Sequence, residues 1–306
     1  MCIRDRVGTV AFDAIETPFG KTNKIIGGAA TYIGLSASKF YNHINLVSVV
    51  GDDFPKSAIE MMQNHKINTE GLQIKEGEKT FFWAGKYHNN MNTRDTLDTQ
   101  LNVLENFEPW VPANYQDCEC LMLGNLMPSV QQKVLLQLKE RPKLIVLDTM
   151  NFWMDNCLKD LMEALKEVDV LTINDEEARQ LSGEHSLVKA ARKILSYGPK
   201  YLIIKKGEHG SLLYHNDQTF LAPAVILNNV VDPTGAGDTF AGGMAGFLAS
   251  QDTLNFEVLK TAMVYGSSVA SFCVTDFGTK AIVNTSILQI KKRVDALKKS
   301  VEFKTF

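Results

Sequence analysis

Residues 232–246 read Asp-Pro-Thr-Gly-Ala-Gly-Asp-Thr-Phe-Ala-Gly-Gly-Met-Ala-Gly and join an apolar run to a helical pattern. The run 224–231 has strand character, and after the glycines Phe240, Met244 and Leu248 recur at helical spacing. The glycines are therefore predicted to lie at a helix N-terminus. Backbone N–H groups without intrahelical partners and the positive end of the helix dipole meet there, and small residues let an anion approach closely.

Asp238 follows these glycines in the first turn of the predicted helix. Beside an anion-binding turn, a carboxylate can accept the proton of a substrate hydroxyl that attacks phosphorus. A Gly-rich turn can also simply connect a strand to a helix, with the Asp offsetting the helix dipole. The full stretch favours a site for phosphoryl transfer.

The segment Asp-Pro-Thr-Gly-Ala-Gly-Asp-Thr-Phe at 232–240 resembles, residue for residue, the C-terminal signature of the ribokinase-like (PfkB) carbohydrate kinases. The resemblance implies that Gly235, Ala236 and Gly237 form an anion hole and that Asp238 is the catalytic base. It also implies an α/β fold of three αβα layers with a mostly parallel central sheet and a small antiparallel β lid. The expected reaction moves the γ-phosphoryl group of ATP, with Mg²⁺, to a hydroxyl of a small sugar or polyol.

Composition and charge fit this class. The chain has 306 residues, of which 45% are hydrophobic and 22% charged, and we expect 1–306 to form a single kinase domain. The net charge of −3 argues against a nucleic-acid partner, and the chain lacks a membrane-spanning apolar run or a signal-peptide pattern. A cytoplasmic location is expected. Five scattered cysteines and six dispersed histidines show neither a disulfide framework nor zinc-site spacing.

The first six residues, Met-Cys-Ile-Arg-Asp-Arg, do not read as a buried strand, because charge interrupts the apolar pattern until 7–12. Either the first strand is short, or foreign sequence has replaced the natural N-terminus. We interpret 1–6 as foreign.

Apolar strand candidates alternate with helical patterns through most of the chain, which predicts βαβ units around a mostly parallel sheet. The strand candidates are 44–50, 120–123, 144–147, 168–173 and 201–204, and the helical patterns are about 28–40, 55–65, 129–139, 155–167, 186–196, 236–250, 255–273 and 284–300.

One region lacks this alternation. From 71 to about 99 an aromatic run is followed by a polar segment, without a helical pattern between strands. The resemblance implies that 13–24 and 71–99 form the lid, which closes over the acceptor and excludes water from the activated phosphate. The aromatic residues of the lid could instead pack a homodimer interface.

Asn174 and Glu177 follow the strand candidate 168–173 and open a helix. Their spacing is that of a capping box. The resemblance implies a second role, in which both residues help to position Mg²⁺ and the triphosphate through water. Mg²⁺ keeps several waters and needs no dedicated carboxylate cage.

The segment Lys205-Lys206-Gly207-Glu208-His209-Gly210 ends another strand and reads as a hairpin turn. In the family the equivalent turn contacts the nucleotide, which implies such a role for Lys206, Gly207 and Gly210. Relatives commonly carry Thr at the position of Lys205, so the resemblance assigns no role to this lysine.

The loop that ends at Gly278 closes a long helix and reads as a C-cap. The resemblance places Gly278 and Thr234 beside the nucleotide. In many family members a monovalent cation lies near this loop and the region of Asp232, so activation by K⁺ is an open expectation.

Gly27-Gly28 precedes a helix, as the Gly-Gly signature of the family does. Gly28 and Asp13 match positions that contact substrate hydroxyls, and Asn125 at a strand end is a further candidate. Ala29 and Tyr32 stand where ribose-specific members carry Lys and Asn, which argues against assuming ribose.

Two alternatives remain for the function. A nucleoside kinase of the same family would stack a base on Trp83, Tyr87 or Tyr32. A non-catalytic sugar-binding regulator would keep the fold but would have no use for a base beside an anion hole.

Overall fold

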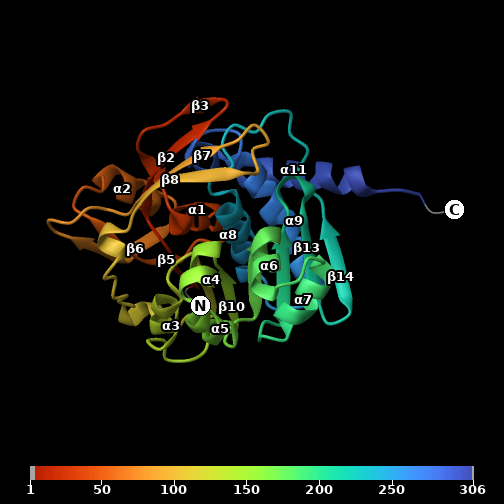
Figure 1. Ribbon diagram of the computed structural model, residues 1–306, viewed down its shortest axis with the longest axis horizontal. Coiled ribbons are helices and arrows are strands. Elements are labelled where there is room, and N and C mark those ends of the chain that lie inside the picture. Colours follow the sequence, from red (N-terminus) through yellow and green to blue (C-terminus); the bar gives the residue numbers. More distant parts are fainter. Residues whose placement is uncertain (1–3, 305–306) are drawn as a thin grey trace.

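The computed structural model describes residues 4–304, which form two sheets with helices around the larger one (Figure 1). The larger sheet has nine strands and is parallel except for its last hairpin. In spatial order its strands are β14 (Gln218–Ala222), β13 (Ser211–His215), β12 (Tyr201–Lys205), β11 (Val170–Asn174), β10 (Leu144–Asp148), β9 (Cys120–Leu123), β1 (Arg4–Val7), β5 (Ile44–Gly51) and β6 (Ile67–Lys75).

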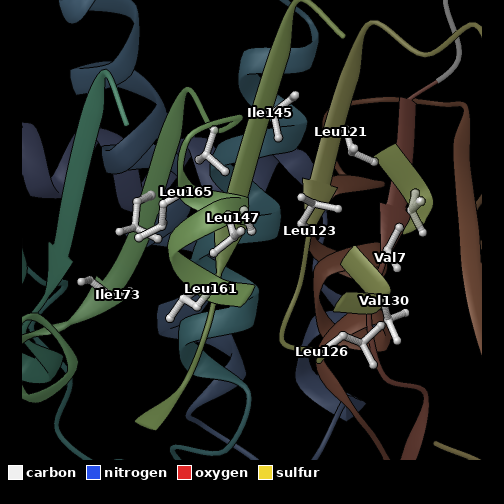
Figure 2. Packing of buried hydrophobic residues seen from close by; sticks show 14 of the residues in the cluster. Val7, Leu121, Leu123, Leu126, Val130, Ile145, Leu147, Leu161, Leu165 and Ile173 are labelled. Carbon is white, nitrogen blue, oxygen red and sulfur yellow. The ribbon is translucent and has the colours of Figure 1, made fainter. Parts of the chain in front are cut away.

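Central strands such as β9 are apolar on both faces because helices cover both sides of the sheet. Leu121 and Leu123 face one helical layer, as Figure 2 shows, while Met122 faces the other. The three-layer αβα prediction is confirmed. The first layer holds α3 (Pro128–Leu135), α5 (Leu158–Leu165), α6 (Asp175–Ser182) and α7 (Leu187–Leu195); the second holds α1 (Ala29–Ala37), α2 (Lys56–Asn64), α8 (Ala236–Ala249) and α9 (Phe256–Cys273).

The described residues hold three further α-helices, α4 (Asn151–Asn156), α10 (Lys280–Asn284) and α11 (Ile287–Val301). The sequence pattern missed α4 and α10, which are only six and five residues long. Within 4–304, no helix is both long and apolar enough to cross a bilayer.

Helices α1 and α8 pack backbone to backbone. A Cβ added to Gly242 would lie 2.5 Å from the Ile33 Cα, and one added to Gly246 would lie 2.6 Å from the Ala37 Cα. Only glycine fits at both positions of α8. The two helices begin at Gly28 and Gly235, so this contact fixes the two N-termini relative to each other.

The smaller sheet forms the lid (Figure 1). The lid was predicted as an antiparallel sheet formed by 13–24 and 71–99, and both the residue range and the strand pairing differ from that prediction. Residues 71–75 belong to β6 of the large sheet, where they pair with β5, and β2 pairs with β7 in parallel, so the lid is a mixed sheet. The lid strands are β2 (Ala11–Thr17), β3 (Gly20–Lys21), β4 (Ile25–Gly27), β7 (Phe82–Tyr87) and β8 (Arg94–Gln100).

The first strand is short, and one other prediction about strands is wrong. The run 7–12 is split, because β1 ends at Val7 in the large sheet and the chain enters the lid at Ala11. Ser48 holds this crossing, since its Oγ donates to the Gly8 carbonyl and accepts from the Val10 N–H. The run 224–231 forms no strand. Of the residues suspected to be foreign, 1–3 lie outside the described part of the chain.

Candidate active site

A cavity of about 1080 Å³ lies between the carboxyl ends of the central strands and the lid. Parallel α/β sheets bind ligands at this edge. The volume is large enough to hold a nucleotide and a second small molecule. The run 224–231 is apolar because it forms part of the cavity wall. The residues of the run that line the cavity are Ala224, Val225, Ile226, Leu227 and Val230.

The predicted anion hole forms the floor of this cavity. Gly235 caps α8 in the left-handed region, at φ 71°, and a Cβ there would lie 2.6 Å from the Tyr32 ring. Both constraints require glycine. Gly235, Ala236, Gly237 and Asp238 all line the cavity. The Ala236 N–H donates to the Pro233 carbonyl over 3.2 Å, whereas the first N–H groups of a helix have no intrahelical acceptor. The turn therefore presents donors to an anion.

Asp238 lies in the first turn of α8 and is deeply buried. Burial and, next, the Asp148 carboxylate raise the pKa of its carboxyl to about 7, against the opposing effects of Lys205 and Arg94. A general base is most effective when its pKa lies near the operating pH, so a carboxyl group with a pKa near 7 is suited to this role. The geometry thus places a proton acceptor beside an anion hole.

Asp13 lies across the cavity on β2. Its carboxyl occupies the space that a side chain on Gly27 would fill, and the Gly28 N–H donates to it. Burial, with help from Asp232, raises the pKa of Asp13 to about 7. Asp13 and Gly28 both line the cavity, as predicted for groups that hold substrate hydroxyls.

Asn174 and Glu177 form a capping box. The Asn174 N–H donates to Glu177 Oε2 over 2.7 Å, and the Glu177 N–H donates to Asn174 Oδ1 over 2.8 Å. Both residues also line the cavity, and burial raises the pKa of Glu177 to about 7. Their oxygens suit Mg²⁺ held through water, since this ion prefers oxygen ligands. Among the described residues, no group of three or more His, Cys, Asp or Glu side chains could hold a metal.

The remaining predicted residues divide into two groups. Thr234, Gly207, Gly210 and Asn125 line the cavity, whereas Lys206, Gly278 and Asp232 are not part of its wall. The Asp232 carboxylate accepts from the N–H groups of Thr234 and Gly278, so it ties two loops together beside the anion hole.

The Asn125 side chain is held by its neighbours. Its Oδ1 accepts from the Trp153 Nε1–H over 2.7 Å, and its Nδ2 lies 3.0 Å from the Met150 Sδ. Asn125 therefore orients an aromatic residue of α4 at the cavity wall.

Sequence reasoning missed an ion pair between Lys205 and Asp148. The Lys205 Nζ lies 2.9 Å from Asp148 Oδ1 and 3.2 Å from Oδ2. Asp148 ends the apolar strand β10, and an acidic residue at the carboxyl end of a parallel strand was the available signal.

Two contacts join the lid to the rest of the site. The Thr234 Oγ1 donates to the Tyr87 hydroxyl over 3.3 Å, and the Asn92 Nδ2 donates to Glu208 Oε1 over 3.4 Å. Strand β7 thus touches the loop before α8, and the lid tip touches the turn after β12. The lid therefore contacts the rest of the molecule at two places beside the cavity, before α8 and after β12.

The fold and this cavity define a class of protein, a lidded α/β enzyme that holds a carboxyl group, Asp238, beside the N-terminus of α8. The sequence matches the model of the pfkB family of carbohydrate kinases over residues 2–286, and the chain belongs to that family. It is 30% identical over 247 residues to the cytidine kinase of Thermococcus kodakarensis, which covers 79% of this chain and 87% of the relative.

Solved structures agree with this fold. The nucleoside kinase of Methanocaldococcus jannaschii has a TM-score of 0.76 at 22% identity, covering 97% of this chain and 99% of that one. An Escherichia coli protein described as a ribokinase II, in complex with ATP and Mg²⁺, has a TM-score of 0.78 at 19% identity, covering 97% and 100%. The protein is a phosphotransferase with a hydroxyl group as acceptor, as predicted.

Proposed function

We propose that the protein transfers the γ-phosphoryl group of ATP to a hydroxyl of a nucleoside. The observation that carries the choice of a nucleoside over a free sugar or polyol is the aromatic wall of the cavity. Phe81 and Trp83 line it from the lid side, and Phe152 and Trp153 line it from α4. A base can stack on such rings, whereas a small sugar would leave them in contact with water.

Trp83 is the lid residue best suited to contact a base. Its ring occupies the space beside Gly85 where a Cβ would otherwise lie, so it packs flat against β7. The Arg94 guanidinium lies 5.7 Å from the ring centroid. Tyr32, in contrast, packs under Gly235 and is only 1% exposed, which leaves no free face for stacking.

In this proposal the other residues take the roles implied by their positions. Asp13 and Gly28 hold acceptor hydroxyls, and Asp238 accepts the proton of the attacking one. Thr234, Gly207 and Gly210 face the nucleotide, while Asn174 and Glu177 hold Mg²⁺ through water; bound Mg²⁺ would offset phosphate charge. The cytidine kinase named above supports a nucleoside acceptor.

Release of ADP in the presence of ATP and Mg²⁺ is expected with at least one nucleoside, and more weakly with free sugars, polyols and sugar acids. Trp83→Ala should raise KM for the nucleoside about tenfold or more, because a stacked base is worth about 1–3 kcal/mol. KM for ATP should stay unchanged. Trp110→Ala is the control, since Trp110 lies outside the cavity wall and is half exposed. Turnover with a sugar alone would refute the nucleoside acceptor but not the kinase.

The pH profile follows from the pKa of Asp238. The group acts as a base only when it is ionised, and its pKa is about 7. We expect kcat/KM for the acceptor to fall tenfold per pH unit below about pH 7 and to level off above it. Asp13 also has a pKa of about 7, so the profile is measured again in Asp13→Asn. A flat profile from pH 5 to 8, or loss of the acid limb in Asp13→Asn, would contradict this assignment.

Activation by K⁺ near Asp232 and a homodimer formed through the lid stay predictions. Asp232 accepts hydrogen bonds from the Thr234 and Gly278 N–H groups, so a cation bound at Asp232 would act on these two loops. Leu97 on β8 and Phe19 at the β2–β3 turn are exposed apolar residues of the lid.

A further inference from the structure

The wall of the cavity is rich in acidic groups. Among its described residues, Lys205 and Arg94 are the only two with a positive charge. A triphosphate carries about four negative charges, so its phosphates need cationic partners besides Mg²⁺. The acidic residues are Asp13, Asp148, Asp155, Glu177, Glu208 and Asp238.

The two cationic residues differ in how far their side chains are exposed to solvent. Arg94 is an exposed residue of lid strand β8. Lys205 ends the central strand β12, and its side chain is 16% exposed while that of its partner Asp148 is 6% exposed. A buried ion pair often stabilises a fold no better than an apolar pair of equal volume. Stability alone therefore does not account for the Lys205–Asp148 pair.

The ammonium group of Lys205 lies at the anion hole itself. Its Nζ is 3.2 Å from the point where a Cβ on Gly237 would be. The positive end of α8 and a lysine ammonium thus occupy adjacent space, so a single phosphate group can contact both. Burial opposes the charge of Lys205, but Asp148 and Glu177 raise its pKa above the usual value and keep it protonated.

We propose that Lys205 is a catalytic residue that binds the transferred phosphoryl group at the anion hole, and that Asp148 is a positioning residue that holds it there. The acceptor oxygen forms a bond to the γ-phosphorus as the bond to the bridging oxygen of ADP breaks. The electron pair of that bond leaves with ADP, and the acceptor proton passes to Asp238. Lys205 donates to a γ-phosphate oxygen throughout this step.

This proposal rests on the ATP-dependent transfer proposed above but not on the nucleoside. It is tested by calorimetric titration of the Mg²⁺ complexes of AMP-PNP and ADP, which differ by the γ-phosphate. Lys205→Met should weaken AMP-PNP binding about tenfold to a hundredfold and leave ADP binding within twofold. Lys205→Arg should restore part of the loss. Lys298→Met, at an exposed position of α11, is the matched control.

Because Lys205→Met leaves the Asp148 carboxylate buried without its partner, the uncharged double variant Lys205→Met/Asp148→Asn is measured as well. It should fold and show the same selective loss of AMP-PNP binding. Asp148→Asn alone should lower kcat and move the alkaline limb of its pH profile to lower pH, because the carboxylate no longer supports the ammonium. A purely structural role for Asp148 would leave that limb in place.

Equal affinity of the wild type and the double variant for AMP-PNP, with kcat of Lys205→Met within twofold, would overturn the proposal. If the wild type binds AMP-PNP but phosphorylates no nucleoside, the acceptor assignment fails while the binding comparison still decides the role of Lys205. If the wild type binds neither nucleotide, both proposals fail.

Discussion

Replacing Asp238 with Asn is expected to lower kcat by about a hundredfold to ten-thousandfold, the usual range for loss of a general base. Asparagine keeps the shape of the side chain but cannot accept the proton of the acceptor hydroxyl. The fold should not suffer, because Asn removes a buried carboxyl whose pKa burial has raised to about 7. Steady-state kinetics at pH 8 measure the change, and calorimetry checks that AMP-PNP still binds.

Asp217→Asn is the control for this substitution. Asp217 lies in the exposed turn between β13 and β14, away from the large cavity, and its variant should keep wild-type kcat. A folded Asp238→Asn enzyme with kcat within threefold of the wild type would remove Asp238 from the role of base.

Gly235→Ala should lower kcat by about a hundredfold to a thousandfold, the range seen when one donor of an anion hole is lost. The new Cβ would lie 2.6 Å from the Tyr32 ring, so the turn or the ring must move. The left-handed backbone at φ 71° adds about 1 kcal/mol of strain. Displacement of the first N–H groups of α8 should weaken AMP-PNP binding as well as turnover.

Gly77→Ala separates the effect of backbone strain from the effect of the steric clash. Gly77 has a φ of 75° but no atom within 4 Å of its ideal Cβ, so this variant bears the backbone strain without the steric clash. It should lose stability but keep kcat. Similar losses of kcat in both variants would show that general destabilisation, rather than the anion hole, explains the effect of Gly235→Ala.

The parts of the site that are local in sequence could be predicted from it. The predicted anion hole and its base lie within four consecutive residues, and the helical periodicity after them fixes the start of α8. The capping box of Asn174 and Glu177 is also local, since three positions separate the two residues. Their spacing left two roles open, and the structure shows that the cap faces the cavity.

Contacts between distant segments could not be predicted in this way. Lys205 and Asp148 are 57 positions apart and meet only because β10 and β12 end at the same edge of the sheet. Lys205 is the last residue of β12 and lines the cavity, whereas Lys206 lies beyond the strand end and does not. Choosing between them requires the register of β12, which the run of apolar residues before it does not specify.

The error at 224–231 has a different cause. An apolar run shows that residues avoid water, but it does not show whether protein or a ligand covers them. Pro223 offers no N–H to a strand ladder, and Asn228-Asn229 interrupts the run. Ile226 is 87% exposed and lines the cavity, as suits a side chain that a bound nucleotide would cover.

The glycine contacts between α1 and α8 bear on enzyme engineering. Because Gly242 and Gly246 bring the two helices together, Gly28 and Gly235 stand on one packed block, and the two parts of the cavity wall that they form keep their spacing. The lid residues Phe81 and Trp83 are not part of that block. Randomised libraries at these two positions can therefore change which acceptor is selected while the reacting groups keep their alignment.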